Sequence, residues 1–485
     1  MHNRNYIIKT ISAVMMLVGL AMLLPAGVSL YYGEESSVRA FAVCALPMAV
    51  VGFAMQKYIP ESGRALRMRD GLLIGALSWL LMSALGCLPF TIEGCIPGFA
   101  DAFFETSSGF STTGASILTD IESLPKGMLL WRSLTHWLGG MGILVLTIAL
   151  FPMLGIGGQR VMRAETTGPT MDKTNFTLRE SASSLYKIYT LFTVAEIALL
   201  MAGGMSLYDA AIHSFGTVGT GGFSNYSASV AQFGSVYIEL VIVVFMLACG
   251  VNFGIYHRLI FGRKLSALRD PELKTYLSIV AVSTLFIAGC LYLNGLTSAG
   301  EGLRQSVFQV SSVITTTGYA TADFALWPLP ARIVLFMLMI IGSCASSTGG
   351  GIKVIRLIFA WKVMRRGVRR RLHPDSVEPI KLGGRSVSEE AVSSTVTFLF
   401  LYIVTAAVGI FLLSFENTDF ETCITSVIAC LSNIGPGFGL VGPTGNFAFY
   451  SDAAKILLAL IMIAGRIELY AILLPLSPRF WNPAR

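Results

Sequence analysis

The sequence predicts an all-α membrane protein, and three observations lead to this fold class. Hydrophobic residues make up 54% of the 485-residue chain and charged residues only 13%, against about 25% in a typical globular protein. The mean hydropathy is +0.68. Ten apolar stretches are long enough to cross the roughly 30 Å of hydrocarbon in a bilayer. This composition excludes a water-soluble protein, a disordered chain, a collagen-like fibre and a disulfide-stapled secreted module.

The ten apolar stretches are spread over the whole chain. They are Ile11–Tyr31, Phe41–Gln56, Leu72–Phe90, Leu129–Leu154, Ile188–Leu207, Val236–Ile260, Leu277–Leu293, Ile333–Phe359, Val396–Leu413 and Ala453–Leu474. Arg4 and Lys9 precede the first stretch as they would in a signal peptide, but about twenty apolar residues exceed the hydrophobic region of such a peptide. We therefore interpret the first two stretches, within residues 1–69, as two extra transmembrane helices ahead of a repeated unit.

The basic residues predict how these spans are oriented. If the N-terminus is cytoplasmic, 28 Lys and Arg residues fall on the inner side and only six on the outer side. Such an excess follows the positive-inside rule and places both termini in the cytoplasm. The net charge of +7 is thus a sign of membrane orientation, and no nucleic-acid partner is expected.

The longest inner segment after the eighth span is strongly basic. Between Lys362 and Arg385 it carries Arg365, Arg366, Arg369, Arg370 and Arg371. Lipid headgroups are the simplest partner for such a cluster. A docking face for a cytosolic subunit is the alternative.

Four segments on the predicted outer side share one pattern. They are Asp101–Ser116, Asp209–Ser224, Gln305–Ala320 and Glu421–Phe438. Each has an amphipathic run too short to span a bilayer, followed by small or hydroxylated residues and a glycine. The aligned glycines, Gly114, Gly222, Gly318 and Gly435, are separated by 108, 96 and 117 residues. The spacing predicts four pseudo-symmetric units of span, short pore helix and span, at residues 70–160, 161–265, 266–372 and 373–485.

These four loops predict a cation filter around one pore. Non-helical backbone at membrane depth is tolerated only where it is buried in protein or faces water, and four copies around an axis meet this condition together. Each short helix would direct its negative end at the centre, and each loop would offer carbonyl oxygens to a dehydrated cation. The predicted metal-binding residues are Thr112, Thr113, Gly114, Thr220, Gly221, Gly222, Thr316, Thr317, Gly318, Asn433, Ile434 and Gly435. One such loop alone would be interpreted as an ordinary turn.

The register is open in the second loop. A shift of up to three residues, onto Thr217–Gly221, resembles a potassium-channel filter. We prefer Gly222, because the glycine and aromatic residue at 222–223 match those at 318–319. The fourth loop departs from the pattern, with Ile434 where the others have Thr or Gly.

A glycine-rich segment interrupts the eighth apolar stretch. Residues 342–351 contain four glycines among small residues, and each glycine costs a helix about 1 kcal/mol relative to alanine. We expect the helix to break here, below the filter, and to form a gate across the pore. The predicted gate residues are Gly342, Ser346, Thr348, Gly349, Gly350 and Gly351. Tight packing of small helical residues is the alternative, and the spacing does not fit a phosphate-binding P-loop.

Arg466 is a charged residue about midway in the last apolar stretch. A charge at this depth costs about 2.5 kcal/mol or more, so Arg466 should face water or a partner such as Glu468 or a carbonyl. Beneath a cation filter its charge would raise the barrier to conduction. A purely structural salt bridge is the alternative.

The remaining polar residues predict no catalytic or metal centre. His136, His213 and His257 lack clustered ligands, and we expect them to be packing or interfacial residues. Most of the eight cysteines lie in apolar runs, so no disulfide is expected. Five carboxylates at or near the starts of the short helices are predicted to cap them and to concentrate cations at the outer mouth. They are Asp101, Glu105, Asp209, Asp419 and Glu421.

With these four loops, two leading spans and the glycine-rich segment, the chain resembles, nearly end to end, the TrkH/TrkG-type subunits of bacterial potassium uptake systems in the Trk/Ktr/HKT superfamily. The resemblance implies a homodimer in the bacterial inner membrane, gated by a cytosolic nucleotide-binding TrkA-type ring. It also implies potassium as the transported ion, because relatives that pass potassium carry glycine in all four loops, whereas sodium-preferring plant relatives tend to have serine in the first. In relatives the glycine-rich segment acts as a gate, and a basic residue at the position of Arg466 faces the pore.

We therefore expect potassium uptake through the four loops, with no enzymatic activity and no cofactor in this chain. The alternative is a secondary transporter that couples cation or solute entry to protons or sodium. Transporters of that class are commonly built from two inverted halves with broken helices. The four short segments here lie in same-sense units on one side, which disfavours that alternative.

Overall fold

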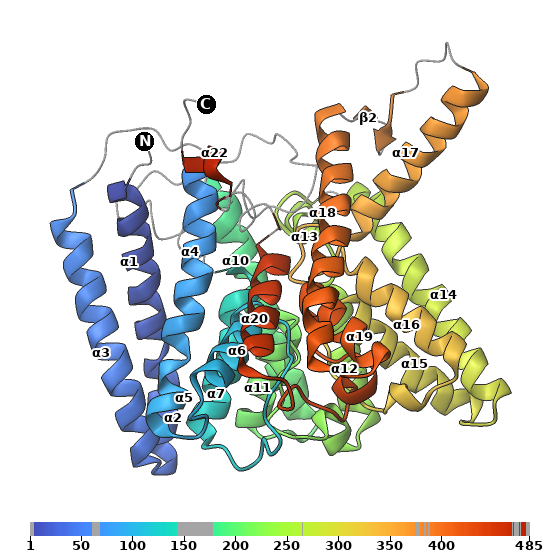
Figure 1. Cartoon of the computed structure of the whole chain (residues 1–485). Coiled ribbons are helices and arrows are strands. Elements are labelled where there is room, and N and C mark those ends of the chain that lie inside the picture. Colours follow the sequence, from blue (N-terminus) through green and yellow to red (C-terminus); the bar gives the residue numbers. More distant parts are fainter. Residues whose placement is uncertain are drawn as a thin grey trace.

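A computed structural model of the chain is helical almost throughout (Figure 1). It describes residues 4–60, 68–142, 178–263, 265–373, 379–382, 385–386, 389–467, 469, 475 and 477–481. In this part of the chain the only strands are β1 (Lys381–Leu382) and β2 (Arg385–Ser386), a two-residue antiparallel pair. The described residues also form five short 3₁₀ turns, at Ser229–Phe233, Leu265–Arg269, Phe324–Leu326, Ser414–Glu416 and Gly439–Val441.

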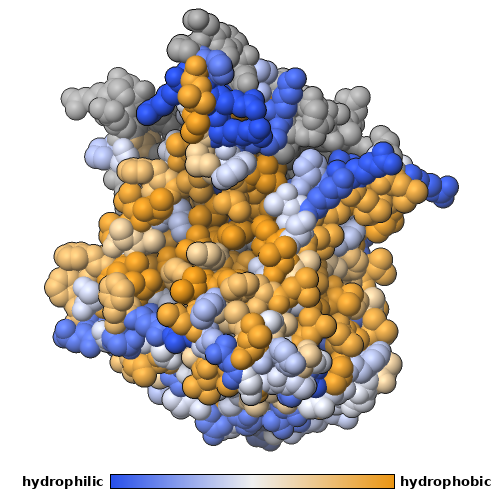
Figure 2. All heavy atoms as spheres, turned by 90° about the vertical axis from the view of Figure 1, so that its right-hand side faces the viewer, coloured by the Kyte–Doolittle hydropathy of each residue, from blue (hydrophilic) through white to orange (hydrophobic). Residues whose placement is uncertain are grey.

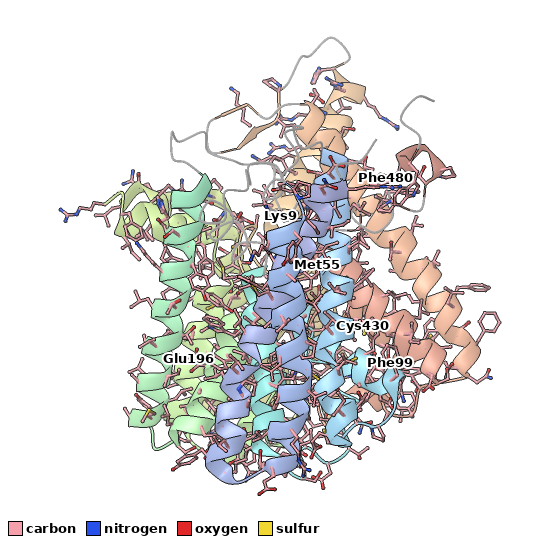
Figure 3. The ribbon with its side chains drawn as sticks, turned by 90° about the vertical axis from the view of Figure 1, so that its left-hand side faces the viewer. Lys9, Met55, Phe99, Glu196, Cys430 and Phe480 are labelled. Atoms are coloured by element: carbon pink, nitrogen blue, oxygen red, sulfur yellow. The ribbon has the colours of Figure 1, made fainter. Side chains whose placement is uncertain are left out.

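The chain starts with a helical pair at one side of the molecule, blue in Figure 1. Helices α1 (Arg4–Ala21) and α2 (Leu23–Tyr32) together form one span, and α3 (Glu35–Tyr58) returns beside them. Gly19 and Gly52 allow close approach, because a Cβ at either position would lie 2.9 Å from a methionine Cβ on the opposite helix. Figure 3 shows Lys9 near the end of α1 that lies close to the termini, and Phe99 toward the opposite end of the molecule.

A three-helix pattern then occurs four times. A long helix leads to a short helix of 12 to 16 residues, which is followed by another apolar helix. The long helices are α4 (Met68–Gly86, extended by α5, Leu88–Glu93), α10 (Leu178–Ala202), α14 (Pro271–Leu293) and α18 (Glu389–Leu413). The short helices are α6 (Phe99–Phe110), α11 (Leu207–Gly219), α15 (Ala299–Ile314) and α19 (Phe420–Leu431). The helices that follow are α7 (Lys126–Gly140), α12 (Val236–Cys249), α16 (Leu329–Ile341) and α20 (Asp452–Arg466).

The described residues contain six helices that are long and apolar enough to span a bilayer, or seven if one bent pair counts as a span. Other predicted stretches correspond to shorter helices in the described part of the chain, such as α16 and α20. The predicted stretch Val236–Ile260 bends by 91° between α12 and α13 (Phe253–Ile260). A Cβ at Gly250 would lie 2.5 Å from the Tyr276 hydroxyl, and the Asn252 side chain accepts the Gly254 N–H and so starts the new helix. The end of the fourth predicted stretch, and most of the inner segment between the fourth and fifth stretches, lie outside the described residues.

The eighth predicted stretch is also divided, as its glycines predict. Helix α16 ends at Ile341, and α17 (Val354–Leu372) begins after an irregular segment and carries the arginine cluster. A last short helix, α22 (Pro478–Trp481), lies near the C-terminus.

Apolar side chains cover the middle of one face of the molecule. Figure 2 shows hydrophobic residues across the centre of one face, with hydrophilic residues gathered toward its two ends. Val282 and Leu285 of α14 are each 67% exposed, and Phe400 and Ile403 of α18 are 65% and 64% exposed. Large apolar side chains in such numbers on a surface indicate contact with lipid.

Candidate functional site

Each short helix of the four units ends at an irregular segment with the same backbone conformation. We call residues 112–114, 220–222, 316–318 and 433–435 the first to fourth glycine segments. Their first residues have left-handed φ angles of 55 to 58°; they are Thr112, Thr220, Thr316 and Asn433. Their last residues have φ angles of 81 to 97°; they are Gly114, Gly222, Gly318 and Gly435. Glycine adopts such angles without the strain that a side chain adds.

This repeated conformation aligns Gly222 of the second segment with the last glycines of the other three segments. Thr217 lies inside α11, where its hydroxyl donates to the His213 carbonyl at 2.8 Å, as a helical threonine commonly does. In the alternative register over Thr217–Gly221, the first three residues belong to this helix and not to an irregular segment. Gly222 takes the place equivalent to the other three glycines.

The four segments interlock in a closed ring. A Cβ at Gly114 would collide with the Gly221 carbonyl oxygen, one at Gly222 with that of Thr317, and one at Gly318 with that of Ile434. A Cβ at Gly435 would lie 2.8 Å from the Thr113 carbonyl oxygen, which closes the ring. Each glycine thus packs against the carbonyl group just before the equivalent glycine of the next unit. The ring leaves no room for a side chain at these positions.

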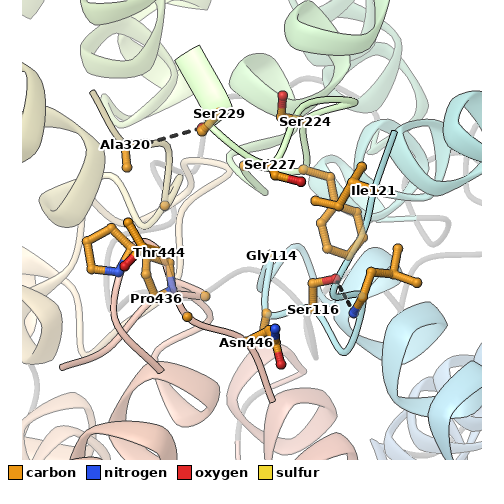
Figure 4. Close-up of a pocket in the computed structure, with 18 of the residues that line it drawn as sticks. Gly114, Ser116, Ile121, Ser224, Ser227, Ser229, Ala320, Pro436, Thr444 and Asn446 are labelled. Atoms are coloured by element: carbon orange, nitrogen blue, oxygen red, sulfur yellow. Dashed lines mark hydrogen bonds between the residues drawn. The ribbon is translucent and has the colours of Figure 1, made fainter. Parts of the chain in front are cut away.

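A cavity of about 130 Å³ adjoins this ring and is lined by all four glycines. Figure 4 shows residues from the four units around its opening. Its lining includes the polar residues Ser116, Ser224, Ser227, Ser229, Thr444 and Asn446. Within the described chain its lining has no carboxylate, but it does include Arg132.

The segment between α16 and α17 packs directly against the ring. The Gly350 N–H donates to the Thr316 hydroxyl at 2.6 Å, and the Thr348 hydroxyl donates to the Cys249 carbonyl at 3.3 Å. Left-handed φ angles occur at Gly342 (71°), Ser346 (52°) and Gly351 (75°). The predicted break is thus an irregular loop, which we call the intramembrane loop (residues 342–353), and not a packed helix.

Arg466, the last residue of α20, ties this loop to the first unit. Its guanidinium donates to the Thr348 carbonyl at 2.7 Å and to the Gly139 and Gly140 carbonyls at 2.9 Å each. Carbonyl groups are one of the two partners predicted for it, and Glu468, the other, lies outside the described residues. Arg466 is the last residue of α20, and most of the predicted apolar stretch beyond it lies outside the described residues.

Comparison with known proteins identifies the family. A family model described as a cation transport protein, TrkH, matches residues 35–482. The chain belongs to the TrkH family of cation transport proteins. This confirms the resemblance found in the sequence and assigns the chain to transport proteins, not to enzymes.

Similar proteins cover the whole chain. The Trk system potassium uptake protein TrkH of Salmonella typhimurium is 37% identical, over 99% of this chain and 100% of its own length. The Trk system potassium uptake protein TrkG of Escherichia coli K12 is 33% identical, over 96% of each chain. The crystal structure of the potassium transporter TrkH from Vibrio parahaemolyticus matches with a TM-score of 0.88 at 33% identity, covering 99% of this chain and 100% of the other. The chain is thus a multi-pass, helical membrane protein with a TrkH fold.

In this TrkH-family chain, most of the predicted capping carboxylates lie at the starts of short helices. Asp419 caps α19, and hydrogen bonds from the side chain and amide of Thr422 hold the pKa of Asp419 below its ordinary value. Ser206 caps α11 and donates its hydroxyl to Asp209 at 2.7 Å. The carboxylate at Asp101 pairs with Lys455 at 2.5 Å. Glu421 pairs with Arg332. None of these carboxylates lines the cavity.

The prediction for Glu105 is wrong. It lies in the middle of α6, is 1% exposed, and pairs with Arg132 of α7 at 2.5 Å. The sequence held two signs of this pair: a glutamate beyond the first turn of a largely apolar short helix, and an arginine inside an apolar stretch 27 residues later. Burial of either charge alone would be unfavourable, and such residues are therefore commonly paired.

Two charged residues, one beside the intramembrane loop and one at its end, were not singled out in the sequence. Glu272, at the start of α14, accepts the Ala345 N–H at 2.6 Å and the Ile355 N–H at 3.1 Å through the same oxygen, Oε1. Lys353, 4% exposed, donates to the Gly349 carbonyl. These two side chains fix both ends of the loop.

The histidines His136 and His213 are buried in the described structure and contact neighbouring backbone. Nδ1 of His136 lies 2.8 Å from the Gly109 carbonyl oxygen, and Nδ1 of His213 lies 2.8 Å from that of Asp209. No group of three or more His, Cys, Asp or Glu side chains that could hold a metal occurs among the described residues. Any ion in the ring would therefore depend on backbone and hydroxyl oxygens.

Proposed function

We propose that this chain carries potassium ions inward across the bacterial inner membrane through the ring of glycine segments. The closed ring is the observation that carries the proposal. Four units supply equivalent backbone segments whose carbonyl groups lie close together, at the ends of four buried short helices. Rings of carbonyl oxygens replace the hydration shell of a cation in selectivity filters. The names of its relatives, which are potassium uptake proteins, support potassium as the ion.

The proposed filter consists of the twelve residues of the glycine segments. Each short helix ends one or two residues before its segment, so the negative end of its dipole lies beside the ions. Ile434 fits this role although its side chain is apolar, because only its carbonyl group would contact the ion. The Asn433 amide donates to the Thr113 hydroxyl at 3.0 Å and stabilises the junction between the fourth and first segments.

The proposed gate is the intramembrane loop. Its predicted gate residues lie against the third segment and, at Gly350, against the Ser432 carbonyl before the fourth. An ion leaving the filter on this side would require the loop to move. Arg466 holds the loop through Thr348 and adds a positive charge beneath the ring, which opposes cation passage.

We also propose a cytosolic nucleotide-binding TrkA-type subunit as the gating partner, and a homodimer with cytoplasmic termini as the assembly. Helix α17 supports this regulation, since it starts where the intramembrane loop ends and extends to the arginine cluster at the end of the molecule where the termini lie. A partner that displaced α17 would pull directly on the loop. The four units would be residues 70–160, 161–265, 266–372 and 373–485, with residues 1–69 as an added pair of helices.

Uptake of a radioactive Rb⁺ tracer into proteoliposomes of the purified chain tests the proposal. Saturable uptake that K⁺ blocks, and that needs no gradient of another ion, is expected. Dependence on a proton or sodium gradient would indicate the coupled transporter instead. If no uptake occurs, the TrkA-type subunit is added with nucleotide; absence of uptake in its presence as well would overturn the proposal.

A further inference from the structure

A buried ion pair lies directly behind the first and second glycine segments. Glu105 of α6 and Arg132 of α7 are 1% and 2% exposed, with Oε1 and Nε 2.5 Å apart. Neither residue belongs to the proposed filter. Both side chains use further atoms to hold the backbone that follows a filter glycine.

Glu105 holds the first segment. Its Oε1 accepts the Ser116 hydroxyl at 3.0 Å, and its Oε2 accepts the Ile117 N–H at 3.0 Å. These residues directly follow Gly114 and Ala115. The Ser116 carbonyl in turn accepts the N–H of Phe447, in the fourth unit, at 2.8 Å. One carboxylate thus fixes the chain that leaves the first segment and, through it, a contact with the fourth unit.

Arg132 holds the second segment. Its Nη1 donates to the Ser224 carbonyl at 2.9 Å, two residues beyond Gly222. Its guanidinium also lies 3.6 Å from the centre of the Phe223 ring. Because the same side chain pairs with Glu105, the first and second segments are connected through a single, fully buried bridge.

The other junctions of the ring are connected differently. Between the second and third segments, the Tyr319 hydroxyl donates to the His213 carbonyl at 3.0 Å. Near the third and fourth segments, Arg332 pairs with Glu421, whose side chain is 44% exposed. Near the fourth and first, the Asn433 amide donates to the Thr113 hydroxyl, and Lys455 pairs with Asp101, whose side chain is 31% exposed. Solvent weakens both of these pairs, so they hold the backbone less firmly.

We propose that the Glu105–Arg132 pair is a positioning element that determines ion selectivity, by holding the first and second segments at the separation that suits potassium. The inference rests on the proposed function, since it takes the ring as the filter. Sodium is the smaller ion, and a ring that contracts can coordinate it. Loss of the bridge frees the backbone after Gly114 and Gly222, and the ring then accommodates sodium better.

The test compares potassium and sodium as inhibitors of Rb⁺ uptake in proteoliposomes. Replacing both charges together, Glu105→Gln with Arg132→Gln, removes the bridge without leaving a buried charge alone. This double variant is expected to keep Rb⁺ uptake while its preference for K⁺ over Na⁺ falls several-fold. Glu105→Gln alone leaves the positive charge of Arg132 at the cavity wall, and uptake of all cations is expected to fall.

A matched control replaces another ion pair of the same residue types. Glu239 of α12 and Arg304 of α15, 3.6 Å apart, hold no glycine segment, so Glu239→Gln with Arg304→Gln should keep the wild-type preference. An unchanged preference in the folded Glu105/Arg132 double variant would overturn the inference, even if total uptake falls. If that variant does not fold, Arg132→Lys is tested instead, since it keeps the charge but loses the planar double contact. The same preference for K⁺ over Na⁺ then decides the outcome. A wild-type chain without K⁺-sensitive uptake, with or without the TrkA-type subunit, would overturn the proposed function instead.

Discussion

The backbone nitrogen of Gly350 lies 2.6 Å from the hydroxyl oxygen of Thr316, so the backbone of the intramembrane loop contacts a side chain of the third glycine segment directly. A Cβ at Gly350 would also collide with the Ser432 carbonyl, at the end of the fourth short helix. The loop can come this close only because residue 350 has no side chain. The proposed gate and the proposed filter would therefore be in direct contact.

Gly350→Ala is expected to raise basal Rb⁺ uptake several-fold in the absence of a partner subunit. The added methyl group collides with the Ser432 carbonyl, so the loop must move away from the ring. Gly367→Ala in α17 is the control, because a Cβ there meets no atom within 4 Å. Wild-type uptake by a folded, monodisperse Gly350→Ala protein would mean that the loop does not obstruct the path.

Gly318→Ser is expected to lower the preference for K⁺ over Na⁺. The new Cβ would collide with the Ile434 carbonyl, which belongs to the fourth segment of the proposed filter. Backbone strain at φ 83° adds about 1 kcal/mol to the cost of folding. Uptake competition between the two ions measures the preference.

Gly295→Ser separates backbone strain from the collision. Gly295 has a similar φ of 67°, but a Cβ there would meet no atom within 4 Å. Its replacement should cost similar stability and leave selectivity unchanged. If Gly318→Ser shows the same preference for K⁺ over Na⁺ as Gly295→Ser, Gly318 is not part of the proposed filter.

The glycine segments could be predicted from the sequence because their requirement is local. Each needs a positive φ at its last residue and small neighbours, and a glycine at a fixed place in four copies shows this directly. The break before α17 could be predicted for the same reason, since four glycines in ten residues weaken any helix. Arg466 was identifiable because a charge within an apolar stretch is rare.

What could not be predicted depends on contacts between distant parts of the chain. The Gly139 and Gly140 carbonyls that accept from Arg466 precede it by 327 and 326 residues. Glu105 was expected to be a cap because its place on α6 relative to α7 is a property of packing, not of composition. The bend after α12 was missed because Gly250 and Asn252 interrupt an otherwise apolar run too briefly to change its hydropathy.

Glu272→Ala is expected to destabilise the intramembrane loop by about 1–3 kcal/mol, because two buried N–H groups lose their acceptor. These donors belong to Ala345, near the start of the loop, and to Ile355, in the first turn of α17. Thermal unfolding and basal Rb⁺ uptake measure the effect, and uptake is expected to rise. Glu272→Gln keeps an oxygen acceptor and should behave much like the wild type. Equal damage from both substitutions would show that the negative charge, and not the hydrogen bonds, matters.

Arg466→Ala is expected to increase Rb⁺ uptake, because it removes a positive charge beneath the ring and releases the Thr348 carbonyl of the loop. Arg466→Lys keeps the charge but cannot reach all three carbonyl groups, so its uptake should lie between those of the wild type and the alanine variant. Arg263→Ala, which removes an exposed arginine three residues beyond α13, controls for loss of charge alone. The two effects of Arg466 also differ in their response to ions: the charge should impede every cation, whereas the released loop should raise basal uptake mainly without the partner subunit. A folded alanine variant with wild-type uptake would leave Arg466 a purely structural link between α7 and the loop.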